Sequence, residues 1–194
     1  MRAVSPAPIM SSGTQNALTT TQGGATGFIP MVLYSNTSTA STSGTTASPW
    51  TTTGVGSLTI PANYMVPGKV LHIRAGALLT TAATPGTVTM TVTLGATNVW
   101  AGVANTPTAS ITSICDLDVY ATCLTAGAGG TLGISAKLVF TTVDGSATLL
   151  FDFTVSGGKA FNTTVANTLA VTSTNSVASG AVFTVPNFFV EALA

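Results

Sequence analysis

Residues 87–94, Thr-Val-Thr-Met-Thr-Val-Thr-Leu, decide the fold of this chain. Four threonines alternate with four apolar residues. Because successive side chains of a β-strand point to opposite faces, the segment predicts a strand with one hydroxyl face and one core face. It lies within residues 56–101, a stretch with almost no charge that we interpret as strands separated by loops, turns and a hairpin. The segment therefore predicts an all-β protein.

The same pattern of strands and turns continues through the rest of the chain. The expected strands are residues 27–35, 57–60, 69–80, 87–94, 99–101, 111–125, 131–142, 147–155, 168–174 and 181–193. Residues 95–98 and Asp144-Gly145 are the hairpin signals, residues 36–49 are expected to form a loop, and Pro186 is expected to break or bulge the last strand. Because no segment shows helical periodicity, we predict a single antiparallel jelly-roll sandwich over residues 27–194. Residues 1–26 have low complexity and are expected to form a flexible or extended N-terminal arm.

Charge is scarce in this chain. Only 5% of its 194 residues are charged, against roughly 25% in an ordinary soluble domain, and the formal net charge is +0. A surface of this kind is poorly protected against association, so we expect most of it to be covered in an assembly. The five basic residues form no stripe that would bind phosphates, and no apolar run reaches the ~18 residues of a membrane span. We therefore expect no nucleic-acid or membrane partner.

The two cysteines are expected to be free thiols. Cys115 and Cys123 fall in one predicted strand, where eight residues at about 3.3 Å each place them roughly 26 Å apart. A disulfide needs Cα atoms within about 7 Å, so the two residues are expected to pack in the core without pairing. Residues 1–13 lack the apolar centre of a signal peptide, which also favours synthesis in a reducing cytoplasm.

Asp116 and Asp118 are the most conspicuous pair of acidic residues. At positions i and i+2 of a strand, their carboxylates share one face at about 6.6–7 Å. Such a pair has the composition of a glycoside hydrolase site or a calcium site. We favour a structural interpretation, either a cross-strand ion pair with Arg74 or Lys137 or a solvated face of the strand.

His72 is the only histidine of the chain. Serines and aspartates are available for a Ser-His-Asp triad, but the chain has no Gly-x-Ser-x-Gly nucleophile motif. One histidine cannot form a histidine-rich metal site by itself. We therefore interpret His72 as structural, and we predict no catalytic, cofactor-binding or metal-binding residues.

The threonines of residues 87–94 permit one further interpretation. Ranks of threonine can order water, but that use needs several ranks stacked at a regular repeat, and the sequence identifies only one such strand. We interpret these threonines as the polar outer face of a strand rich in β-branched residues.

Several of these segments together resemble a group of small virion proteins of tailed bacteriophages. The resemblance is carried by residues 57–63 (SLTIPAN), 67–76 (PGKVLHIRAG), 87–95 (TVTMTVTLG), and by Asn175-Ser176 with residues 182–194. It covers roughly residues 27–194 and leaves out the N-terminal arm. It implies a jelly-roll structural protein of the virion, commonly without enzymatic activity, located on the head as a decoration or cement protein or on the tail.

These observations lead to one expected function. We expect a non-enzymatic cement protein that assembles in the host cytoplasm, binds the major capsid protein on the outer head surface as a homotrimer, and stabilises the shell. The alternative is a tail or fibre component that recognises a host-surface glycan, and a third class is a glycoside hydrolase. Candidate contact residues are Ile9, Met10 and Leu18 in the arm, followed by Trp50, Phe188 and Phe189, which could equally belong to the core.

Overall fold

The computed structural model describes residues 19–22, 25–28, 31–102, 104–142 and 148–193. These residues form strands and no helix. The strands are β1 (Thr19–Gln22), β2 (Ala25–Phe28), β3 (Met31–Asn36), β4 (Ala40–Thr42), β5 (Ser48–Pro49), β6 (Gly54–Gly56), β7 (Thr59–Ile60), β8 (Val70–Thr81), β9 (Val88–Leu94), β10 (Thr97–Ala101), β11 (Thr112–Thr125), β12 (Thr131–Thr142), β13 (Thr148–Ala160), β14 (Asn167–Asn175) and β15 (Ala181–Leu193).

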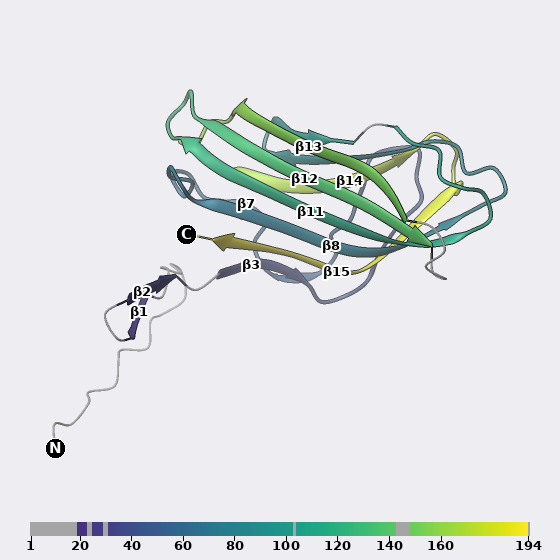
Figure 1. Ribbon diagram of the computed structural model, residues 1–194, viewed down its shortest axis with the longest axis horizontal. Helices are drawn as coiled ribbons and strands as arrows, with labels where there is room; N and C mark the ends of the chain where they lie inside the picture. Colours follow the sequence, from purple (N-terminus) through teal and green to yellow (C-terminus); the bar gives the residue numbers. More distant parts are fainter. Residues whose placement is uncertain (1–18, 23–24, 29–30, 103, 143–147, 194) are drawn as a thin grey trace, which may run out of the picture.

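Two antiparallel sheets pack against each other, as predicted. The larger sheet has the order β13-β12-β11-β8-β15-β3-β6, with β4 added beside β15. The smaller sheet has the order β10-β9-β14-β5, with β7 added beside β14. Figure 1 looks onto the larger sheet, and the smaller sheet lies behind it. The protein is therefore a β-sandwich.

Eight of these strands follow the order of a jelly roll. In chain order the eight are β3, β5, β8, β9, β10, β11, β14 and β15, which correspond to strands B to I of that fold. The larger sheet then contains B-I-D-G (β3-β15-β8-β11), and the smaller sheet contains C-H-E-F (β5-β14-β9-β10). The hairpin of β12 and β13 lies between strands G and H in the chain and widens the larger sheet. The predicted jelly roll is thus confirmed, with one extra hairpin.

Alternating side chains build the core between the sheets. In β9 the side chains of Val88, Met90, Val92 and Leu94 are buried, whereas the threonines between them are half-buried on the outer side. The core also contains the tilted ring pair of Trp50 and Phe183, whose centroids lie 5.1 Å apart. Both rings are fully buried. Their contact joins strand β15 to the segment that follows β5.

Most predicted turns and strand ends agree with the structure. Gly95 and Ala96 connect β9 to β10, and Gly95 has a φ of 57°, which glycine adopts without strain. The register of β15 against β8 shifts between Thr184 and Asn187, which places the predicted bulge at Pro186. The Asp144-Gly145 turn lies outside the described residues, between the paired strands β12 and β13.

Three predicted boundaries differ from the structure. The segment 36–49 was expected to be a loop, but it contains β4 and β5, which are too short to show periodicity. The strand predicted over residues 147–155 continues to Ala160, because Lys159 and Ala160 still pair with β12 beyond a register shift at Gly157 and Gly158. The predicted end of the arm at residue 26 falls inside β2, which pairs with β1 as a small hairpin beyond the sandwich (Figure 1).

Phe183 provides a test of this core. We expect Phe183→Ala to lower the free energy of unfolding by about 3–5 kcal/mol, since a fully buried aromatic ring is lost and a cavity remains beside Trp50. Urea unfolding followed by tryptophan fluorescence measures the loss. The control Val165→Ala, at a side chain that is 47% exposed, should cost less than about 0.5 kcal/mol. Similar losses for both variants would contradict this description of the core.

Candidate functional site

The charged residues of the strands are confined to one sheet. All seven Asp, Glu, Lys and Arg residues that lie in strands belong to the larger sheet, in β8, β11, β12, β13 and β15. We call the outer side of that sheet the charged face and define it by His72, Arg74, Asp116, Asp118, Lys137 and Glu191. The strands of the smaller sheet contain no charged residue. The sandwich therefore has two broad faces of different chemistry.

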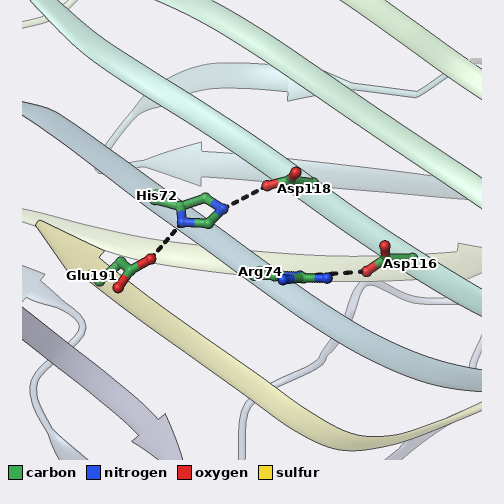
Figure 2. Close-up of polar contacts among 5 residues, drawn as sticks. All are labelled: His72, Arg74, Asp116, Asp118 and Glu191. Atoms are coloured by element: carbon green, nitrogen blue, oxygen red, sulfur yellow. Dashed lines mark hydrogen bonds and ion pairs between the residues drawn. The ribbon is translucent and has the colours of Figure 1, made fainter. Parts of the chain in front are cut away.

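His72 lies at the centre of the charged face, between two carboxylates (Figure 2). Its Nε2 is 2.6 Å from an oxygen of Asp118 on β11, and its Nδ1 is 2.6 Å from an oxygen of Glu191 on β15. The three residues come from three neighbouring strands, because β8 pairs with β11 on one side and with β15 on the other. His72 is 8% exposed, so these contacts are largely shielded from water.

This arrangement is suited to holding strands together. When both ring nitrogens carry protons, each donates to one carboxylate oxygen, and neither nitrogen is left to accept a proton from a serine hydroxyl. Among the described residues the Ser-His-Asp triad is not assembled, because the polar contacts of the His72 ring are with Asp118 and Glu191. In the described part of the chain no group of three or more His, Cys, Asp or Glu side chains is placed to hold a metal ion.

The two aspartates have separate partners. Asp116 forms an ion pair with Arg74, with 3.8 Å between its Oδ1 and Nε, and both side chains are about half exposed. This confirms one of the two predicted cross-strand partners. Asp118 lies opposite Arg74 and Lys137 in the ladder but contacts His72. The carboxylates therefore do not converge on one position, as a shared ion or substrate would require.

Tyr120 completes the charged face. Its ring stacks on the His72 ring with centroids 4.3 Å apart and an interplanar angle of 5°. A hollow of about 350 Å³ lies beside it, with Leu124, Gly133 and Ser135 in its lining. Among the aromatic residues whose exposure the structure gives, Tyr120 is the most exposed, at 36%. One exposed ring does not form the cluster of aromatics that glycan recognition at one end of the sandwich would need.

The outer side of the smaller sheet carries two rows of threonines, one on β9 and one on β14. We call it the threonine face and define it by Thr89, Thr91 and Thr93 of β9 with Thr168, Thr172 and Thr174 of β14. In the ladder Thr91 lies opposite Thr172 and Thr89 opposite Thr174. The sequence showed the rank on β9 but not the second rank beside it, because the pairing of β9 with β14 joins segments about 80 residues apart.

The predicted contact residues lie in three different environments. Ile9, Met10 and Leu18 fall outside the described residues. Trp50 and Phe188 are buried in the core, at 0% and 1% exposure, which agrees with the alternative that they are core residues. Neither side chain offers surface to a partner. Phe189 is half-buried on the outer side of β15, where its ring forms a T-shaped pair with the His72 ring, with 6.2 Å between the ring centroids.

Glu191 is the residue of the charged face that sequence reasoning missed. It stands alone as an acid in an apolar strand, and no local signal connects it to His72, which lies 119 residues earlier. Its alternation with Phe189 and Leu193 indicates an outward position, but only the pairing of β15 with β8 shows what it contacts.

Both cysteines are free and buried, as predicted. Cys115 and Cys123 point inward from β11. Burial raises the pKa of the Cys115 thiol well above its ordinary value, and the neighbouring Asp116 carboxylate raises it further. Burial also raises the pKa of the Cys123 thiol.

Comparison with protein-family models, curated proteins and solved structures finds no match for this chain. Among the residues described, no helix is long and apolar enough to cross a membrane.

The His72 contacts predict a difference between two neighbouring aspartates. We expect Asp118→Asn to lower the free energy of unfolding by about 1–2 kcal/mol, because it weakens a charge-assisted hydrogen bond to a shielded ring. The matched control Asp116→Asn should cost less than about 1 kcal/mol, since its ion pair with Arg74 is exposed. Urea unfolding gives both values, and an equal or larger loss for Asp116→Asn would contradict the central role of His72.

The buried thiols make a second prediction for this region. Thiol exchange needs the thiolate, which burial and a raised pKa both disfavour. We expect no reaction of the folded protein with Ellman's reagent at pH 8 and about two equivalents of thiol after denaturation. Rapid reaction of one thiol in the folded protein would show that β11 opens at one end. The variant Cys123→Ala identifies which thiol reacts.

Proposed function

We propose that this chain is a non-enzymatic structural protein of a tailed-phage virion that binds the outer surface of the head and stabilises the shell. The observation that carries the proposal is the jelly roll in combination with its scarcity of charge. An isolated sandwich with 5% charged residues is prone to association, and coverage in an assembly removes this problem. The resemblance of residues 27–194 to small virion proteins supports the same assignment.

Cementing follows from mass action. A protein that binds the assembled shell but not its separate parts stabilises the shell by the free energy of binding. The major capsid protein is the proposed partner, and a homotrimer is the proposed form, because three copies joined together multiply the contacts made with the shell. The arm contributes the apolar residues Ile9, Met10 and Leu18 as further anchors.

The alternative function is recognition of a host glycan by a tail or fibre component. Tyr120 and the hollow beside it are the features that favour it. A pyranose stacks its apolar side on an aromatic ring, but one face of Tyr120 is already occupied by His72. Head binding is therefore the better supported proposal.

Binding to heads tests the proposed function. Purified protein is mixed with capsids that lack it, and saturable co-sedimentation is expected. Two deletions separate the arm from the sandwich: removal of residues 1–18 leaves the β1–β2 hairpin intact, and removal of residues 1–28 takes it away. We expect the first deletion to weaken binding by about tenfold, since Ile9, Met10 and Leu18 are lost.

Each result of this test has a definite meaning. If both deletion variants bind as tightly as the full-length protein, the proposed function stands and all contacts with the head lie on the sandwich. Failure of the full-length protein to bind heads would overturn the cement proposal and favour the glycan-binding alternative. Light scattering of the same samples measures whether the protein is trimeric.

A further inference from the structure

We infer that the threonine face of the smaller sheet is the surface that lies against the capsid shell, and that the charged face points to solvent. This inference rests on the proposed function and adds the orientation of the protein on the head. The partner is a protein surface that is itself poor in charge and presents backbone and side-chain groups that form hydrogen bonds.

The distribution of charge supports this orientation. The strands of the smaller sheet carry no Asp, Glu, Lys or Arg, whereas all strand charges belong to the larger sheet. The centres of protein–protein interfaces are depleted of charged residues, because each charge buried without a partner is costly. The threonine face can therefore be covered with little desolvation penalty, whereas covering the charged face would dehydrate Arg74, Lys137 and Asp116.

The threonine hydroxyls indicate what kind of surface covers them. Thr168 forms a hydrogen bond with Thr59 at 3.3 Å, but the hydroxyls of the other five threonines form none with the described residues. Elsewhere in the chain hydroxyls are used internally, as in the buried contact of Thr42 with Ser173 at 2.7 Å. A hydroxyl that is buried without a partner is destabilising, so the covering surface must supply donors and acceptors. A hydrocarbon surface cannot do so, and a polyanion would find no cation in these strands.

The geometry of the face also favours a rigid contact. Thr91 lies opposite Thr172 and Thr89 opposite Thr174, so the threonine residues form two aligned rows on neighbouring strands. Threonine is β-branched and has one restricted side-chain torsion, so ordering it at an interface costs little entropy. Lysine or glutamate at these positions would lose far more freedom. The face is thus already ordered for binding.

The opposite face provides a matched control. Leu78 and Ile114 lie directly opposite each other in the ladder of β8 and β11, and both are exposed on the charged face, at 42% and 48%. A pair of lysines placed there adds the same charge as a pair placed at Thr91 and Thr172. The two double variants differ in the sheet that carries the new charges.

The experiment compares full-length Thr91→Lys/Thr172→Lys with full-length Leu78→Lys/Ile114→Lys in the co-sedimentation test. We expect the threonine-face variant to bind capsids lacking this protein at least about tenfold more weakly, because two unpaired charges would be buried. The control should bind within about twofold of the unmodified protein. Circular dichroism melting checks that each variant folds. If the double lysine variant does not fold, Thr91→Lys alone and the near-isosteric Thr91→Val/Thr172→Val take its place.

Other results would overturn the inference, and each can be told apart from a failure of the proposed function. If only the control loses binding, the shell meets the charged face. If neither variant loses binding, the contact lies on the arm or on the sheet edges. If the threonine-face variant changes from oligomer to monomer by light scattering, the face holds a second copy of the chain. In these three cases the unmodified protein still binds heads, whereas failure of the unmodified protein itself would overturn the function.

Discussion

The pairing of β8 on both of its edges is the constraint on which the charged face depends. β8 is hydrogen-bonded to β11 along one side and to β15 along the other. Its inward residues Leu71, Ile73 and Leu79 enter the core, so the register that buries them also sets the outward residues. A shift of one residue would turn these inward apolar side chains to solvent. The apolar core therefore fixes the position of His72 between Asp118 and Glu191.

The separation of the two faces has a simple physical basis. Each strand contributes one side to a common core, so the outer side of each sheet is free to carry any residue that water or a partner tolerates. The outer side of the larger sheet carries ionic groups that form contacts across strands. The outer side of the smaller sheet carries short side chains with hydroxyl groups. A charge-poor outer face is a liability in a free monomer and an advantage in an interface. The two sheets of this sandwich thus have outer faces of opposite ionic character.

Local features of the sequence predicted much of the fold. The alternation of threonine with apolar residues identified β9, and the proline in the last strand identified the bulge of β15. The cysteine spacing excluded a disulfide, since a strand separates side chains by a fixed rise per residue. The short strands β4, β5 and β6 were missed, because two or three residues cannot show a period. Of the charged face, the sequence indicated that Asp116 and Asp118 share one side of a strand, but it offered only Arg74 or Lys137 as ionic partners for both acids.

By itself, then, the sequence determined which side of each long strand faces the core, because that choice depends only on the order of residues along the chain. The tertiary structure alone decided which strands distant in the sequence are neighbours. His72 and Glu191 meet across 119 residues, and the threonines of β9 meet those of β14 in register. Such non-local pairing results from the joint burial of both sheets, which no single segment encodes. The second threonine rank and the two carboxylates at His72 therefore became visible only in the folded protein.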